Sequence, residues 1–245
     1  MRVPESRSVL GYVLRAPLRL VPPTTVVPVL GGPMRGMRWI VGSAPHGAWI
    51  GTLERAILKQ FVGLLRPGMT VWDIGANVGL YSLPSARAVG PTGRVYAFEP
   101  MPQNARLLRR HLNLNRLANV QIWEVAVSDC EGFVSMTEGD SPSEFHVAPQ
   151  GEWTVKAVTL DDWISRNGGS PPDLVKIDVE GSDDAVLRGG ARVFAAHRPT
   201  MLLALHGERQ RRECARLLTG WGYRFGSFRT ERDLDASSEW FAEPA

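Results

Sequence analysis

The stretch Val71-Trp72-Asp73-Ile74-Gly75-Ala76-Asn77-Val78-Gly79 decides how the rest of this chain is organised. Three of its first four residues are apolar β-formers and the other is an acid, Asp73, which predicts a buried strand of a parallel sheet. Gly75 and Gly79 punctuate a tight turn, and Leu80-Tyr81-Ser82-Leu83 then opens a helix. A strand, a glycine turn and a helix in this order form the place where an open α/β sheet holds a nucleotide-like ligand.

The polar residues of this turn indicate which nucleotide it holds. A dinucleotide fingerprint, G-x-G-x-x-G, brings backbone N–H groups close to a pyrophosphate. Here the pattern is D-x-G-x-N-x-G, and Asp73 would repel a pyrophosphate but favour the ammonium and sulfonium charges of S-adenosylmethionine. Glu99 ends a second predicted strand twenty residues after Gly79, where an acid can accept hydrogen bonds from ribose hydroxyls. We therefore expect S-adenosylmethionine rather than NAD; a loop cap at Asp73 and a solvated strand end at Glu99 are the alternatives.

Length and composition indicate one α/β domain of a soluble globular protein. The chain has 245 residues, of which 44% are hydrophobic and 22% charged, and its net charge of +3 is too small to indicate a nucleic-acid partner. The charge is uneven, because residues 1–66 carry nine basic and two acidic side chains. We expect this basic arm to be solvated and partly ordered; contact with an acidic partner or a membrane surface is the alternative.

Cysteine usage, together with apolar runs that fit neither a signal peptide nor a membrane span, predicts a cytoplasmic protein. Cys130 and Cys214 have no metal-ligand spacing and fit reduced thiols. The apolar run from Leu10 to Leu14 is too short for a signal peptide, and the uncharged run from Leu20 to Met34 is too short and too rich in proline to span a bilayer. We expect no transmembrane segment, with peripheral membrane contact as an alternative.

Strands alternate with helices along the rest of the chain, which predicts a Rossmann-like, doubly wound α/β sheet. A short strand is expected at 38–41 within the irregular N-terminal extension. Further strands are expected at 94–98, 120–125, 133–136, 153–158, 173–178 and 200–205, with closing edge strands at 223–225 and 227–228 and a mobile loop at 138–150. Helices are expected at 53–65, 102–114, 183–188 and 208–218, together with a short helix that Thr159 caps. Five polar residues each close an apolar strand, at the strand ends where such sheets bind ligands: Asp73, Glu99, Asp129, Asp178 and His206.

Several blocks of this sequence resemble the FkbM-type family of S-adenosylmethionine-dependent methyltransferases. The blocks are 71–82, Ala97-Phe98-Glu99-Pro100, Asn113-Leu114-Asn115, Val127-Ser128-Asp129, Thr159-Leu160-Asp161-Asp162 and Asp173-Leu174-Val175-Lys176-Ile177-Asp178-Val179-Glu180-Gly181. The first is typical of class I methyltransferases, and the last points to this family in particular. The resemblance implies a seven-stranded sheet, mostly parallel with a reversed C-terminal hairpin. We divide the chain into a basic, irregular N-terminal extension, 1–50, and a methyltransferase domain, 51–245.

The resemblance also implies O-methyl transfer to a hydroxyl of a sugar, a polyketide or another small molecule or glycan. An N-methyltransferase on the same fold and a catalytically degenerate module that binds the cofactor are the alternatives. Two positions depart from the family pattern. After Glu180-Gly181 the family commonly has a small residue and then Glu, whereas this chain has Ser182 and Asp183. Many members also carry Glu two residues before the histidine position, His206 here, whereas this chain has Ala204.

Methyl transfer from a sulfonium is an in-line displacement, so the enzyme aligns donor and acceptor and a positioned base takes the hydroxyl proton. The catalytic candidates are His206, Asp178 and Glu180, with His206 as base because its ring titrates near neutrality. A histidine bonded to a loop carbonyl and carboxylates that cap a helix are the alternatives. The expected cofactor contacts are Asp73, Gly75, Asn77, Gly79, Tyr81, Glu99, Ser128, Asp129 and Asp178.

Two further expectations concern charge. Lys176 lies in an otherwise apolar strand, so we read it as a core lysine paired with an acid. A divalent cation shared by Asp178, Glu180 and His206 is the alternative, and we expect no bound metal.

Overall fold

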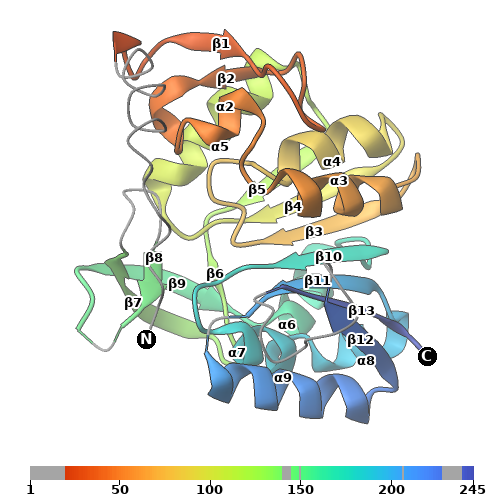
Figure 1. Cartoon of the computed structure of the whole chain (residues 1–245). Helices are drawn as coiled ribbons and strands as arrows, with labels where there is room; N and C mark the ends of the chain where they lie inside the picture. Colours follow the sequence, from red (N-terminus) through yellow and green to blue (C-terminus); the bar gives the residue numbers. More distant parts are fainter. Residues whose placement is uncertain (1–19, 140–144, 149, 206, 228–238) are drawn as a thin grey trace.

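The computed structural model describes residues 20–139, 145–148, 150–205, 207–227 and 239–245. Within them, a seven-stranded sheet in the order β12-β13-β11-β10-β3-β4-β5 lies between two layers of helices (Figure 1). β13 is antiparallel to both of its neighbours, and the other adjacent pairs are parallel. The predicted doubly wound, mostly parallel sheet is therefore confirmed. The strands are β3 Thr70–Ile74, β4 Arg94–Phe98, β5 Val120–Trp123, β10 Leu174–Ile177, β11 Thr200–Ala204, β12 Tyr223–Ser227 and β13 Glu239–Pro244.

Helices cover both faces of this sheet. On one face lie α3 Arg55–Leu64, α4 Ser82–Val89 and α5 Pro102–Leu114; on the other lie α6 Leu160–Asn167, α7 Asp183–Gly189, α8 Ala191–His197 and α9 Glu208–Gly220. Successive side chains of a strand point to opposite faces, so β3 serves both layers. Val71 packs into the first core, whereas Trp72 and Ile74 pack into the second.

Helix α6 fixes the second layer through one aromatic residue. The indole of Trp163 makes edge contacts with the rings of Trp72, Tyr96 and Phe98, at centroid distances of 5.3, 5.2 and 4.9 Å. Such edge-to-face pairs add to the burial of apolar area. The predicted cap is present, because the Thr159 hydroxyl accepts a hydrogen bond of 3.1 Å from the backbone N–H of Asp162.

The residues before α3 form more structure than the sequence predicted. Strands β1 Val26–Pro28 and β2 Arg38–Ile40 pair as a hairpin, followed by the 3₁₀ turn η2 Val41–Ser43 and the short helix α2 Gly47–Ile50. Figure 1 shows this segment over α4 and α5. β2 confirms the short strand expected at 38–41. The expected irregular character does not hold for 26–28 and 47–50, where apolar side chains of this segment help to complete the first core. The domain boundary at residue 50 stays a prediction.

His111 of α5 ties this segment to the glycine turn. Its Nε2 accepts a hydrogen bond of 3.1 Å from the Ile40 N–H, and its Nδ1 lies 2.8 Å from the Val78 carbonyl oxygen. The neutral ring with the proton on Nδ1 satisfies both bonds. The Trp39 indole stacks on the imidazole at 4.1 Å, and both side chains are fully buried. Burial lowers the pKa of His111 to about 4, so the ring stays neutral at physiological pH.

A smaller, four-stranded sheet lies beside the main one in the described residues. It consists of β6 Ala126–Val127, β9 Trp153–Val158, β7 Gly132–Glu138 and β8 Phe145–Val147, in this order. The strands predicted at 133–136 and 153–158 are confirmed. The predicted loop at 138–150 is wrong where β8 pairs with β7, because that pairing buries Phe145.

The closing hairpin also differs from the prediction. β12 contains the expected 223–225 and extends to Ser227, but its partner is β13, and Phe228 lies outside the described residues. Trp240 and Ala242 of β13 are buried against β11 and β12, which explains why this later segment occupies the sheet. In the part of the chain that the structure describes, no helix has the length and apolar character needed to cross a bilayer.

The His111 contacts generate a stability prediction. His111→Phe keeps a ring against Trp39 but leaves the Ile40 N–H and the Val78 carbonyl without their partner, so we expect a loss of about 1–3 kcal/mol in unfolding free energy at pH 7.5. The folded pKa lies below the unfolded value of 6.5, so the wild type should lose stability as the pH falls from about 6.5 towards 4. Urea denaturation should show a smaller deficit of the variant at pH 5. An equal loss of unfolding free energy at pH 7.5 and pH 5 would contradict this titration. His197 is exposed, so His197→Phe is the control and should show no such pH dependence.

Candidate functional site

A cavity of about 210 Å³ opens at the carboxyl ends of β3, β4 and β10. This is the edge at which open α/β sheets bind ligands. Its walls come from the glycine turn, from the small sheet and from the segment before α3. Among the predicted site residues, Gly75, Asn77, Tyr81, Glu99, Asp178 and Glu180 line it. Asp73, Gly79, Ser128 and Asp129 are not among its lining residues, and His206 lies outside the described residues.

The glycine turn brings the ends of β3 and β10 together. Gly75 has φ +79°, and a Cβ there would lie 1.9 Å from the carbonyl oxygen of Asp178. The N–H groups of Gly75 and Ala76 donate to the Phe98 carbonyl oxygen at 2.9 and 3.0 Å. Glycine is therefore needed at position 75 for the approach of two backbone segments. Gly79, with φ +105°, similarly allows the turn to pack on side chains of Leu83 and Leu108.

Glu99 connects this turn to the end of β4. One carboxylate oxygen accepts a hydrogen bond of 2.7 Å from the Asn77 N–H, and the other accepts one of 2.9 Å from the Met101 N–H. Asn77 has φ +49°, the left-handed conformation that asparagine tolerates. Glu99 is only 4% exposed, and this burial raises its pKa to about 7, partly offset by the two backbone hydrogen bonds. The oxygen that bonds Met101 also accepts a longer hydrogen bond, 3.4 Å, from the Asn104 side-chain amide, so the oxygen that bonds Asn77 keeps a lone pair for a ligand hydroxyl in the cavity.

Asp73 and Asp129 are engaged elsewhere. The Asp73 carboxylate is buried and accepts a hydrogen bond of 2.5 Å from the Ser82 hydroxyl at the start of α4. Burial raises its pKa to about 6, and its influence on a ligand would act through charge rather than contact. Asp129 pairs with the guanidinium of Arg188 at 3.0 Å. In place of Ser128 and Asp129, the apolar residues 125–127 line the cavity.

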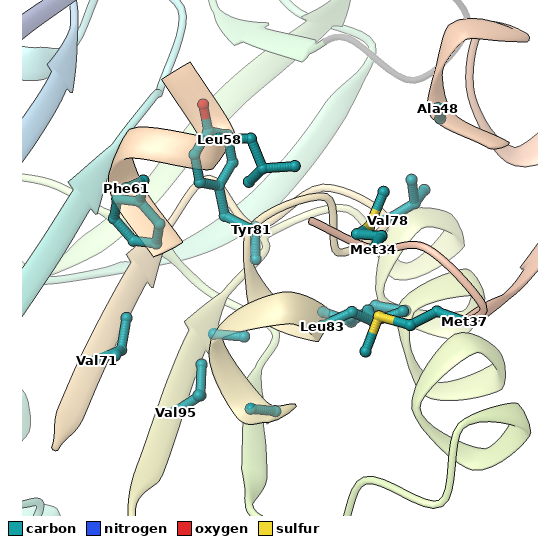
Figure 2. Packing of buried hydrophobic residues seen from close by; sticks show 14 of the residues in the cluster. Met34, Met37, Ala48, Leu58, Phe61, Val71, Val78, Tyr81, Leu83 and Val95 are labelled. Carbon is teal, nitrogen blue, oxygen red and sulfur yellow. The ribbon is translucent and has the colours of Figure 1, made fainter. Parts of the chain in front are cut away.

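The opposite end of the cavity holds a small polar network. The Lys176 ammonium is 2% exposed and lies 3.1 Å from a carboxylate oxygen of Asp178, so the expected pairing of this lysine with an acid is present. The same ammonium lies 5.0 Å from the centre of the Tyr81 ring. The Tyr81 hydroxyl donates a hydrogen bond of 2.5 Å to Glu54. Figure 2 shows Tyr81 beside Leu58 and Phe61 of α3, where the Phe61 ring meets it edge-on at 5.1 Å.

The sequence analysis missed Glu54 and the apolar wall before it. Trp39, Ala44, Pro45, Ala48 and Leu53 line the cavity next to Glu54. One signal could have identified Glu54, because it is one of only two acids among residues 1–66. The apolar wall had no such signal, since its residues are spread over a segment without periodicity.

The described residues contain no group of three or more His, Cys, Asp or Glu side chains placed to hold a metal ion. Glu180 lines the cavity with φ +50° and Asp178 is paired with Lys176. His206, the third side chain of the metal hypothesis, lies outside the described residues.

A model of the methyltransferase FkbM domain matches residues 73–225. The chain belongs to this family. The match covers more than half of the sequence and includes the end of β3 with its glycine turn and the whole of β10. The FkbM resemblance of the sequence motifs is therefore confirmed, and with it a methyltransferase that uses S-adenosylmethionine.

Named relatives support this placement of the FkbM domain. The chain is 30% identical over 168 residues to 2-O-methyltransferase NoeI of Sinorhizobium fredii, covering 60% of this chain and 68% of NoeI. It is 31% identical over 170 residues to 31-O-demethyl-FK506 methyltransferase FkbM of Streptomyces tacrolimicus, and 28% identical over 139 residues to hexuronic acid methyltransferase AglP of Haloferax volcanii. Each of these two alignments covers 56% of this chain, and the chain spans 64% and 56% of those proteins.

Solved structures agree on the fold. A methyltransferase FkbM from Methylobacillus flagellatus has a TM-score of 0.52 at 17% identity, covering 81% of this chain and 53% of that one. An S-adenosylmethionine-dependent O-methyltransferase from Thermotoga maritima has a TM-score of 0.50 at 15% identity, covering 91% and 78%. Both likenesses show the class I methyltransferase fold of the FkbM domain.

The residues that line the cavity fit S-adenosylmethionine. Its adenine needs an apolar slot, which residues 125–127 line, and its ribose diol needs an acceptor, which the carboxylate of Glu99 supplies. Its α-ammonium and its sulfonium carry positive charge, and the carboxylates of Glu54, Asp178 and Glu180 line the other end of the cavity. Along the cavity, an apolar surface is followed by one carboxylate and then by three. This order matches the adenine, the ribose and the cationic groups of the cofactor.

The close approach at Gly75 generates a stability prediction. In Gly75→Val the new side chain would collide with the Asp178 backbone. We therefore expect thermal unfolding to show destabilisation by about 2 kcal/mol or more even without ligand. Gly63→Ala in α3, where an added Cβ meets nothing within 4 Å, is the matched control. Wild-type stability of Gly75→Val would contradict the described turn.

The raised pKa of Glu99 generates a prediction for cofactor binding. If the ionised carboxylate accepts the ribose hydroxyls, affinity for S-adenosylhomocysteine should rise about tenfold between pH 6 and pH 8, as a group with a pKa of about 7 loses its proton. Glu99→Gln should bind more weakly by about 1–3 kcal/mol and lose this pH dependence. Calorimetry at three pH values measures both effects. Full affinity in the variant would remove Glu99 from the ribose site.

Proposed function

We propose that this chain is an O-methyltransferase that acts on a hydroxyl of a small molecule or glycan, such as a sugar or polyketide. The observation that carries the proposal is the cavity of an FkbM-family fold, with Glu99 at one end and carboxylates at the other. The names of NoeI and FkbM of Streptomyces tacrolimicus specify O-methyl transfer, which supports an oxygen acceptor. The name of AglP, a hexuronic acid methyltransferase, supports a glycan among the candidate acceptors.

The protein's contribution to this reaction is alignment, exclusion of water and proton removal. S-adenosylmethionine, when bound, supplies the electrophilic methyl group. Glu99 and residues 125–127 would hold the nucleoside part, and the Lys176–Asp178 pair would fix the carboxyl end of β10 beside the reacting centre. Glu180, Asp178 and His206 are the candidates for taking the hydroxyl proton, because the first two line the cavity and the third follows β11 in sequence. A positioned base of this kind contributes about 10²–10⁴-fold to the rate.

The walls of the cavity support an acceptor with apolar faces. Trp39, Pro45 and Leu53 line it from the segment before α3, and Phe145 and Val147 line it from β8. Sugar rings and polyketides both present C–H faces that pack on aromatic and aliphatic side chains. β8 falls within 138–150, so this segment would contribute to the acceptor side of the cavity.

One observation bears on the degenerate alternative. Ala204 removes an acid that the family pattern places at the end of β11, but Glu239 of β13 lies directly opposite it in the sheet register. Opposed residues of antiparallel strands point to the same face. The negative charge of Glu239 acts on Glu54 in the cavity, where it raises the pKa of that carboxyl. A carboxylate therefore remains near this position, which favours an active enzyme.

The test is transfer of the labelled methyl group from S-adenosylmethionine to a panel of neutral glycosides, hexuronate glycosides, macrolactones and, for comparison, primary amines. We expect label on a hydroxyl acceptor, located by NMR as an O-methyl group, with turnover unaffected by chelation. His206→Ala should lower turnover by about 10²–10⁴-fold at nearly intact cofactor affinity if it is the base. Label on amines alone would favour the N-methyltransferase, and binding without any transfer would favour the degenerate module.

A further inference from the structure

Glu54 stands at a strained position in the wall of the cavity. It precedes α3 with φ +47°, a left-handed conformation that a non-glycine residue adopts at a cost. Backbone strain of this kind persists where surrounding contacts impose it, and it is concentrated at functional sites. The half-buried side chain lines the cavity at the end away from residues 125–127.

Tyr81 holds the Glu54 carboxylate in place. Its hydroxyl donates the 2.5 Å hydrogen bond to Glu54, and its ring is 6% exposed between Phe61 and the Lys176 ammonium. Tyr81 immediately precedes α4, directly after the glycine turn. The carboxylate is therefore anchored to the same turn whose other side, through Asn77, bonds Glu99.

Among the described residues, no cation forms an ion pair with the Glu54 carboxylate. Lys176, the nearest cation of the network, is in an ion pair with Asp178. Burial raises the pKa of Glu54; the Lys176 charge opposes this shift, and the charges of Asp178 and Glu239 add to it. A carboxylate that is partly desolvated, held by a hydrogen bond and part of a cavity wall is complementary to a cationic group of a ligand.

The order of surfaces along the cavity identifies that group. Residues 125–127 suit the adenine, Glu99 suits the ribose, and the glycine turn leads from Glu99 to Tyr81 and Glu54. The next part of S-adenosylmethionine beyond the ribose and sulfur is the amino-acid end with its α-ammonium. We propose that Glu54 binds the α-ammonium group of the cofactor and that Tyr81 positions it for this contact. The proposal rests on the cofactor part of the proposed function and is independent of the acceptor.

The competing role for Glu54 is that of the base that takes the acceptor proton. The two roles differ in ligand binding. A contact with the α-ammonium contributes to the affinity of every ligand that carries this group, whereas a base contributes to turnover and leaves affinity for S-adenosylhomocysteine unchanged.

The test compares two ligands that differ in the amino-acid end. S-adenosylhomocysteine carries the α-ammonium, and 5′-methylthioadenosine has the same nucleoside and sulfur without it. Glu54→Gln should weaken S-adenosylhomocysteine about 10–100-fold, as expected for loss of a charge-assisted hydrogen bond, and 5′-methylthioadenosine less than about twofold. Tyr81→Phe should show the same selectivity with a smaller loss, about 2–10-fold. Glu99→Gln is the matched control, because it should weaken both ligands.

The outcomes separate this inference from the proposed function. Equal losses for both ligands in Glu54→Gln, or unchanged affinity for both, would overturn the assignment; unchanged affinity together with lost methyl transfer would make Glu54 the base. If Glu54→Gln has a lowered melting temperature, the two affinities are measured for Glu54→Asp instead. This variant keeps the negative charge but has a shorter side chain, so it should also weaken S-adenosylhomocysteine more than 5′-methylthioadenosine. Selective loss of S-adenosylhomocysteine in a chain that methylates no hydroxyl would support the inference and overturn the O-methyl proposal. A wild type that binds neither ligand would overturn both.

Discussion

The contact on which the rest of the site depends is the approach of the Gly75 backbone to the carbonyl group of Asp178. It fixes the carboxyl ends of β3 and β10 at a distance that no side chain at position 75 would allow. From this point the turn continues with Asn77 in a left-handed conformation, which directs its N–H to Glu99. The cavity is therefore shaped by backbone geometry, and the side chains that line it take their positions from that geometry.

Carboxylates at this edge of the sheet lower the stability of the empty protein. Burial raises the pKa of Asp73 to about 6 and that of Glu99 to about 7. An acid whose folded pKa lies above its unfolded value holds its proton more tightly in the folded state. Its contribution to stability therefore falls as the pH rises from the unfolded pKa, near 4, towards the folded one. A ligand with positive charge and hydroxyl donors offsets this cost, so cofactor binding and stability are linked.

The segment before α3 completes the site from outside the range that the family model matches, 73–225. His111 bonds both the Ile40 N–H of this segment and the Val78 carbonyl of the glycine turn. The same imidazole thus couples the wall of the cavity that carries Trp39 to the turn below it. The cavity is therefore closed by residues that lie outside the range matched by the family model.

The sequence by itself determined the sheet, its glycine turn and the acids at the strand ends, because hydrophobic runs, glycines and spacing are local properties. It therefore predicted Glu99, Asn77 and Asp178 at one cavity. Only the tertiary structure decided which acids face that cavity: Asp73 turns to Ser82, Asp129 pairs with Arg188, and Glu54 enters from a segment without a motif. The pairing of β8 and of β13 was likewise missed. The physical reason is that the direction of a side chain and the partner of a short strand are set by packing between elements distant in sequence.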